Sequence, residues 1–237
     1  MSRILVLGDS HTGALKEAGP LGAGTEILWV NAKPGRVSGD IGAVDALARS
    51  AELGSEDCLV LMRLGTLHNI IGLLNHDIAF ALVDALDPDE TVEVIPEAIM
   101  REYIAEHAAS DQFLRKMKAR TRCRVGHIMP PAPKKTLDST SRAFGAYRGQ
   151  RIADVGFSPA PRRLALWRLE KLVLDAFLPT IGIVPIAPPP ETLTGEGYLD
   201  PAYAAPDATH ANGAYGARLM ARILAFAAEP APLLRGS

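Results

Sequence analysis

The chain has 237 residues, a length that suits one α/β domain better than two small ones. Hydrophobic residues make up 48% and charged residues 22%, the ordinary balance of a globular protein with a sizeable core. The formal net charge of −2 gives no overall positive field, so we expect no nucleic-acid partner. No run of about 18 apolar residues occurs, so we also expect no membrane-spanning segment.

Short apolar runs alternate along the chain with stretches of helical periodicity. The apolar runs are continuous, as in strands that are covered on both faces. The predicted strands are residues 3–7, 25–32, 57–65, 123–131 and 182–190, and the predicted helices are residues 12–18, 40–53, 96–120, 162–178 and 212–228. Strand followed by helix, five times over, predicts a parallel sheet with helices on both faces.

The expected fold is therefore one α/β domain over residues 1–237, a three-layer α/β/α sandwich around a five-stranded parallel sheet of the flavodoxin-like type. In such sheets ligands bind at the carboxyl ends of the strands. The segments predicted to lie there are Gly8-Asp9-Ser10, residues 31–39, residues 65–69 and the proline-rich ends of the fourth and fifth strands.

Residues 134–161 form a polar, arginine-rich stretch that is too long for an ordinary connection, so we interpret it as an insertion or lid near the site. Residues 134–171 carry nine basic and three acidic residues. This charge fits solvated helix faces that pair with each other, or a basic rim around a site for an anionic substrate. On the second interpretation Arg142 is a candidate substrate-binding residue.

Ser10 ends the first predicted strand, in the stretch "RILVLGDSHTGAL". Its place between a strand and a helix makes it a natural helix N-cap. It can also be a nucleophile, provided that a base lies in reach and that hydrogen-bond donors face the developing oxyanion.

A candidate base lies near the other end of the chain, in "PDATHANGAYGARLM". Asp207 precedes His210 by three residues, so its carboxylate can reach back to the imidazole. One ring nitrogen would then bind Asp207 and the other would face Ser10. The alternative is that Asp207 or Thr209 caps the last helix.

"GDS" after the first strand and "DATH" before the last helix resemble the motifs of the SGNH/GDSL hydrolase superfamily, and they occur in the order of that family at the two ends of the chain. The resemblance implies an ester hydrolase with a catalytic triad of Ser10, Asp207 and His210. It further implies an oxyanion hole built from the Ser10 N–H, a backbone donor and a side-chain amide.

Two sequence motifs between these ends would supply the remaining donors of the oxyanion hole. "VNAKPGRVSGDI" resembles the family's second block and makes Gly39 the expected backbone donor, with Gly35 less favoured and a plain turn as the alternative. The third block departs from the family pattern, because "LGTLHN" places Asn69 two residues late. Either Asn69 still supplies the amide, which is the alternative we favour, or Leu67 and His68 occupy the usual places and the hole has lost a donor.

His11 and His68 are candidate substrate-binding residues. His11 directly follows Ser10, as in members of the family that modify surface polysaccharides by acyl transfer, but it can also be an exposed residue at the start of a helix. His68 can contact substrate or cap the apolar stretch that follows it. His68, His76 and Asp77 lie within ten residues but lack the tighter spacing of zinc sites, so we expect no metal and no cofactor.

The sequence thus predicts a serine esterase of the SGNH type that hydrolyses a short acyl ester, with a carbohydrate ester as one candidate substrate. The alternatives are a carbohydrate O-acyltransferase with the same triad, and a non-catalytic binding protein on the same fold. The expected partner is a small-molecule or carbohydrate ester, with no nucleic acid and no membrane; the oligomeric state is not indicated. Two cysteines expected to be reduced and no leader pattern favour the cytoplasm.

Overall fold

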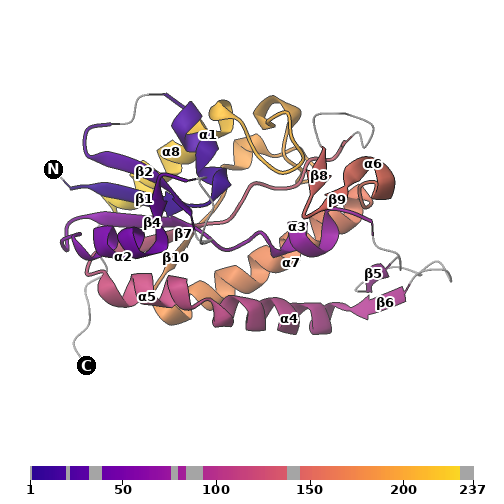
Figure 1. Ribbon diagram of the computed structural model, residues 1–237, viewed down its shortest axis with the longest axis horizontal. Helices are drawn as coiled ribbons and strands as arrows, with labels where there is room; N and C mark the ends of the chain where they lie inside the picture. Colours follow the sequence, from indigo (N-terminus) through magenta and orange to yellow (C-terminus); the bar gives the residue numbers. More distant parts are fainter. Residues whose placement is uncertain are drawn as a thin grey trace.

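A computed structural model describes residues 2–19, 22–31, 39–75, 80–83, 93–137 and 145–229 (Figure 1). Its centre is a six-stranded parallel sheet with the strand order β10-β7-β4-β1-β2-β3. The strands are β1 (Ile4–Gly8), β2 (Thr25–Asn31), β3 (Ile41–Gly42), β4 (Cys58–Met62), β7 (Arg124–Ile128) and β10 (Val184–Ile186). The α/β class and the parallel sheet expected from the sequence are confirmed.

The number of strands was predicted as five, and this prediction is wrong because β3 adds a sixth. β3 pairs with the end of β2, Val30 opposite Ile41 and Asn31 opposite Gly42. The helical periodicity that begins at Asp40 hides these two extended residues in the sequence. Without β3, the five predicted strands, numbered in chain order, lie in the flavodoxin-like order 2-1-3-4-5.

Helices cover both faces of the sheet, which gives the expected three layers (Figure 1). Leu5 and Leu7 of β1 pack into a core with α2 (Ala43–Ala51), α5 (Gln112–Arg120) and α7 (Ala160–Phe177). The alternate residues Ile4 and Val6 pack on the other side with α1 (Gly13–Glu17) and α8 (Gly213–Ala228). Burial on both sides explains why β1 reads as a continuous apolar run.

The single helix predicted over residues 96–120 is wrong, because the chain forms two helices, α4 (Glu97–Ser110) and α5, separated at Asp111. Asp111 is extended, with φ −70° and ψ 93°, and its carboxylate accepts a hydrogen bond from the N–H of Leu114 at 2.8 Å. An aspartate that caps a new helix therefore interrupts an otherwise continuous periodicity.

A second group of elements lies beside the sheet rather than on it (Figure 1). α3 (Leu67–Gly72) packs with α4, α7 and the pair of short strands β5 (Phe80–Val83) and β6 (Glu93–Pro96). The described part of the predicted insertion forms a hairpin, β8 (Ala146–Tyr147) and β9 (Gln150–Arg151), and the short helix α6 (Ile152–Val155).

Short 3-10 helices complete the described chain. They are η1 (Ser10–Thr12), η2 (Leu178–Ile181), η3 (Pro190–Thr192) and η4 (Pro201–Tyr203). Within the described ranges, no helix has the length and hydropathy needed to cross a bilayer.

Candidate active site

The first candidate residue, Ser10, lies at the sharp turn that ends β1. Gly8 is required there, because a Cβ on it would lie 2.7 Å from Met62 Cβ and from Thr12 Cγ2. The side chain of Asp9 accepts a hydrogen bond from the N–H of His11 at 3.0 Å, so Asp9 is the N-cap of η1. The capping role that position alone favoured for Ser10 therefore belongs to its neighbour, and the Ser10 hydroxyl can face another partner.

The second element is the turn that contains Asp207 and His210. One carboxylate oxygen of Asp207 accepts the backbone N–H groups of Thr209 at 2.8 Å and of His210 at 2.7 Å. The last helix, α8, is capped by Asn212 instead, whose side chain accepts from two N–H groups of its first turn. Asp207 and Thr209 therefore do not cap α8.

The two ends of the chain meet at the carboxyl edge of the sheet. His210 Nδ1 lies 2.8 Å from the second carboxylate oxygen of Asp207, and His210 Nε2 lies 2.7 Å from Ser10 Oγ. A carboxylate only accepts, so Nδ1 carries the hydrogen and a neutral ring presents Nε2 as an acceptor to the Ser10 hydroxyl. Residues 200 positions apart thus form one continuous chain of hydrogen bonds.

The electrostatics of Asp207 favour its ionised form. Burial alone would raise the pKa of Asp207. The hydrogen bonds from the ring and the backbone N–H of His210, the His210 charge and the Thr209 N–H outweigh that burial and hold the pKa well below its usual range. Asp207 is thereby suited to orient His210 and to stabilise its protonated form.

Lys134 binds the backbone of the turn that contains Asp207. Its ammonium group donates to the carbonyl of Ala205 at 2.6 Å and also to the carbonyl of Asp207, and it lies 3.8 Å from the Asp207 carboxylate. The residue is buried, and burial lowers its pKa. No local pattern in the sequence indicates this role, because Lys134 and the carbonyls that it binds are 71 and 73 residues apart.

The two expected oxyanion donors follow the strands on either side of β1. Gly39 follows β2 with φ +124°, and a Cβ there would lie 2.9 Å from Asn31 Cβ and 3.0 Å from Asn31 N, so the position requires glycine. Asn69 lies in α3, after β4, and only 7% of it is exposed. Both residues belong to the edge of the sheet that carries Ser10.

The candidate substrate-binding histidines are both buried. The ring centroid of His11 lies 4.6 Å from that of His210. Burial, assisted by the charges of His210 and His68, lowers the pKa of His11 to about 3. His68 Nδ1 lies 2.7 Å from the carboxylate of Glu170 in α7, a partner that the helical pattern of residues 162–178 gave no reason to single out. The interpretation of His11 as an exposed helix-start residue is wrong.

Three of the residues considered in the sequence cannot be placed in the site. Arg142, His76 and Asp77 lie outside the described residues. Among the residues that are described, no group of three histidine, cysteine, aspartate or glutamate side chains could hold a metal ion. Tyr147 and Phe157 of the insertion pack against the same buried apolar cluster as Ala208 of the Asp207–His210 turn.

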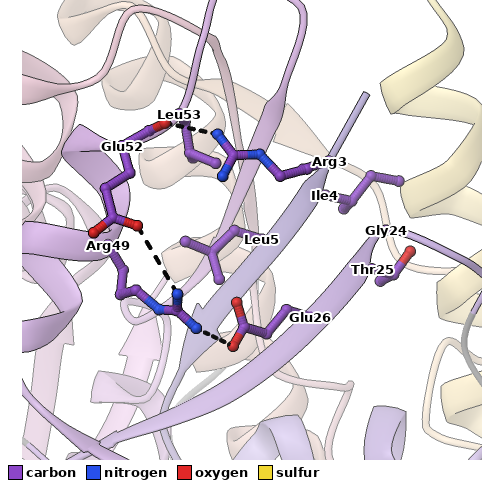
Figure 2. Close-up of a pocket in the computed structure, with 9 residues that line it drawn as sticks. All are labelled: Arg3, Ile4, Leu5, Gly24, Thr25, Glu26, Arg49, Glu52 and Leu53. Carbon is purple, nitrogen blue, oxygen red and sulfur yellow. Dashed lines mark hydrogen bonds and ion pairs between the residues drawn. The ribbon is translucent and has the colours of Figure 1, made fainter. Parts of the chain in front are cut away.

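A hollow of about 240 Å³ lies at the opposite, amino-terminal edge of β1 and β2. Figure 2 shows that its charged side chains are engaged with one another. Arg49 pairs with Glu26 at 2.6 Å and lies 3.9 Å from Glu52, while Arg3 donates to the Glu52 carbonyl. These groups hold the strand ends to α2, whereas the hydrogen-bonded set of Ser10, His210 and Asp207 lies at the other edge.

The fold and these three side chains define an α/β protein with a serine–histidine–aspartate arrangement at the carboxyl edge of its sheet. No family model matches the chain, and no curated protein matches it.

The chain is similar in fold to several solved structures. A GDSL-like lipase from Bacteroides thetaiotaomicron is 14% identical, with 95% of this chain and 87% of that chain covered and a TM-score of 0.47. An extracellular lipase from Streptomyces rimosus is 14% identical, with coverages of 96% and 100% and a TM-score of 0.49. Phospholipase A1 from Streptomyces albidoflavus is 13% identical, with coverages of 96% and 99% and a TM-score of 0.43.

Proposed function

We propose that the chain is a serine ester hydrolase of the SGNH/GDSL type, with Ser10 as nucleophile, His210 as general base and Asp207 as the residue that orients it. The observation that carries the proposal is the unbroken chain of hydrogen bonds from Ser10 Oγ through the His210 ring to the Asp207 carboxylate, with lengths of 2.7 and 2.8 Å. These lengths lie within the reach that proton transfer between nucleophile and base requires.

In the acylation step Ser10 Oγ attacks the carbonyl carbon of an ester while its proton moves to His210 Nε2. The imidazolium is stabilised by the Asp207 carboxylate. Collapse of the tetrahedral intermediate breaks the bond to the leaving alcohol, which takes the proton from Nε2, and leaves an acyl group on Ser10. The developing oxyanion is expected to meet the N–H groups of Ser10 and Gly39 and the amide of Asn69.

Deacylation repeats these steps with a second nucleophile. A water molecule gives its proton to Nε2, attacks the acyl carbon and releases the acid, and Ser10 recovers its proton from His210. If a sugar hydroxyl replaces water, the same steps transfer the acyl group, so carbohydrate O-acyltransfer remains the alternative. We propose a short acyl ester as substrate, and a carbohydrate as the candidate alcohol.

We further propose a cytoplasmic location. Both cysteines, Cys58 and Cys123, are buried and unpaired, which is the usual state of cytosolic proteins. Burial raises the pKa of their thiols to about 12 and about 11, so neither is suited to act as a nucleophile. Fractionation of cells that produce the protein from its natural gene tests the location.

The purified protein and the Ser10→Ala variant, assayed with 4-nitrophenyl acetate, test the nucleophile. We expect turnover by the wild type, loss of nearly all of it in the variant, and labelling of Ser10 alone by a fluorophosphonate. Turnover that survives Ser10→Ala would overturn the assignment of the nucleophile. A wild type that neither turns over the ester nor reacts with the probe would favour the non-catalytic binding protein instead.

A further inference from the structure

The imidazole ring of His11 packs against the ring of His210, the proposed general base. The two ring centroids are 4.6 Å apart, and the ring planes make an angle of 42°. Tilted pairs with centroids about 4.5–7 Å apart are a favourable packing geometry for aromatic rings. His210 already binds Asp207 through Nδ1 and Ser10 through Nε2, so His11 supplies a third contact, by packing rather than by a hydrogen bond.

The backbone of the turn that carries His11 is fixed by hydrogen bonds. The N–H of His11 donates to the Asp9 carboxylate at 3.0 Å, and the Thr12 hydroxyl donates to the Asp9 carbonyl at 2.8 Å. The N–H of Asp9 in turn donates to the carbonyl of Met62 in β4 at 3.1 Å. The side chain of His11 is therefore carried by a turn that is bound to the neighbouring strand, and only 7% of the residue is exposed.

His11 contacts its neighbour as an uncharged ring. Burial, assisted by the charges of His210 and His68, lowers the pKa of His11 to about 3. A neutral ring does not repel the imidazolium that forms when His210 takes the proton of Ser10, and an aromatic face attracts a cation. Nδ1 of His11 is buried and has no hydrogen-bond partner within the described residues, so this nitrogen does not fix the ring. Packing is what places it.

The contact gains importance in the second half of the proposed reaction. Before acylation the His210 ring is bound at both of its nitrogens. Once Ser10 Oγ carries the acyl group, it has no hydrogen left to donate, and Nε2 loses its protein partner. The His210 side chain is 31% exposed, so solvent leaves the ring space to rotate about its remaining bond to Asp207. A general base must nevertheless stay within hydrogen-bond reach of the water that it activates.

We propose that His11 is a positioning residue that keeps the His210 ring in place after Ser10 has been acylated, so that Nε2 stays aligned for the water molecule that releases the acid. This inference rests on the proposed ester hydrolysis at Ser10. It gives His11 a role that is exerted through His210, in place of the direct substrate contact expected from its position in the sequence.

The test separates acylation from deacylation. Steady-state kinetics and the burst of 4-nitrophenolate are measured with 4-nitrophenyl acetate for the wild type and for His11→Ala. The ratio kcat/KM reports the steps up to acylation, whereas kcat also includes deacylation. We expect His11→Ala to lower kcat by about ten- to a hundredfold and kcat/KM by no more than about threefold, so that KM falls as well. The acyl-enzyme should accumulate, which gives a burst close to the amount of enzyme and an acetylated chain in intact-mass spectrometry.

Two further variants distinguish the ring of His11 from its nitrogen. His11→Phe keeps an aromatic ring without a nitrogen atom, so we expect it to recover most of kcat. His11→Asn keeps a polar atom close to the position of Nδ1 but lacks the rest of the ring, so we expect it to resemble His11→Ala. His11→Asn also provides a second truncation of the ring if His11→Ala does not fold.

Leu15→Ala controls for general loosening. Leu15 is fully buried in α1, the helix that follows the turn, and it packs in the core shared with α8. Removing its side chain destabilises the same side of the sheet, and urea denaturation compares the stability of all the variants. We expect Leu15→Ala to keep the wild-type ratio of kcat to kcat/KM and to show no additional accumulation of acyl-enzyme.

The inference is wrong if the truncated variants keep kcat within about threefold of the wild type, or if kcat and kcat/KM fall in equal proportion. It is also wrong if His11→Phe is as impaired as His11→Ala, or if Leu15→Ala shows the same accumulation of acyl-enzyme. In all of these cases a wild type that turns over the ester and is labelled at Ser10 leaves the proposed function standing. A wild type without turnover and without labelling overturns the proposed function, and this inference with it.

Discussion

The carboxylate of Asp9 lies 3.0 Å from the backbone nitrogen of His11 and caps the short helix whose first residue is Ser10. Asp9 therefore caps the helix, and the adjacent Ser10 is left free to act as the proposed nucleophile. We expect Asp9→Ala to lower the free energy of unfolding by about 1 kcal/mol and to lower kcat, because the turn that presents Ser10 loses its anchor. Asp9→Asn, whose side-chain oxygen still accepts, should be nearer the wild type in urea denaturation; equal losses in both variants would contradict the capping role.

The three residues of the proposed triad should respond differently to substitution. We expect His210→Ala to lower kcat about as far as Ser10→Ala, because nucleophile and base act as one unit. Asp207→Asn should lower kcat by roughly 10⁴-fold yet leave more activity than either, because the ring keeps its place while its tautomer and charge are less favoured. Steady-state kinetics with 4-nitrophenyl acetate measures all three, and an unimpaired Asp207→Asn would exclude its role.

Lys134 is expected to act through the Asp207 turn. Lys134→Met keeps the length of the side chain but leaves the carbonyls of Ala205 and Asp207 without their donor. We expect kcat to fall by between about tenfold and a hundredfold with little change in KM, because a small displacement of Asp207 misaligns His210. The free energy of unfolding should fall by about 1–3 kcal/mol.

The adjacent Lys135 provides a matched control for Lys134. Its ammonium pairs with Glu196 at 2.6 Å, but both side chains are more than half exposed, so the pair contributes little. Lys135→Met should therefore resemble the wild type in kcat and in stability. Lys134→Arg, which keeps a cationic donor, should recover part of the lost kcat. Equal kinetics for Lys134→Met and Lys135→Met would show that the turn holds without Lys134.

His127 should make stability depend on pH. It is 2% exposed, accepts the Leu64 N–H at 3.3 Å, and burial lowers its pKa from 6.5 to about 4. Between these values the unfolded chain binds a proton that the folded chain does not, so the free energy of unfolding decreases as the pH falls through this window. At roughly 1.4 kcal/mol per pKa unit, we expect this group to account for a loss of about 3 kcal/mol between pH 6.5 and pH 4.

His127→Gln isolates that contribution, because the amide oxygen can still accept from Leu64 while the side chain no longer titrates. Urea denaturation at pH 7, 5.5 and 4.5 measures the free energy of unfolding. As the pH falls, we expect this free energy to decrease less for the variant than for the wild type. His11, whose pKa is lowered to about 3, also makes the free energy of unfolding decrease as the pH falls, and it does so equally in both proteins. Parallel curves for the two proteins would contradict the assignment to His127.

Ser10, Asp207 and His210 could be predicted from the sequence because each lies next to the end of a strand or the start of a helix that the sequence pattern marks. Ser10 ends an apolar run, and the Asp207–His210 pair precedes the last helix, so the parallel-sheet rule brought them to the same edge. Glu170 and Lys134 were missed because their roles depend on tertiary contacts, 102 residues apart in the case of Glu170 and His68. No local pattern encodes which face of a helix will meet a loop from another strand.

The two errors in the predicted fold, the single long helix and the missing strand β3, have the same cause. In each, a local sequence pattern was followed where another interaction decides the structure. Asp111 looked like one more polar residue on a long helix, but its carboxylate competes for the N–H of Leu114 and starts a new helix. Ile41 and Gly42 looked like the first turn of a helix, but pairing with β2 keeps them extended. In both places one tertiary or capping interaction outweighs a continuous periodicity.

Arg148 and Arg151 lie on the exposed hairpin whose Tyr147 packs against the same buried cluster as Ala208 of the Asp207–His210 turn. We expect Arg148→Gln and Arg151→Gln together to raise KM severalfold for an ester with an anionic acyl group, such as 4-nitrophenyl hemisuccinate, and to leave KM for 4-nitrophenyl acetate unchanged. Because both guanidinium groups are exposed, the effect should fade as salt rises from about 0.01 to 0.5 M. Arg222→Gln, on the exposed face of α8, is the control; an equal KM for the anionic ester in the hairpin variant and the control would reject the basic rim.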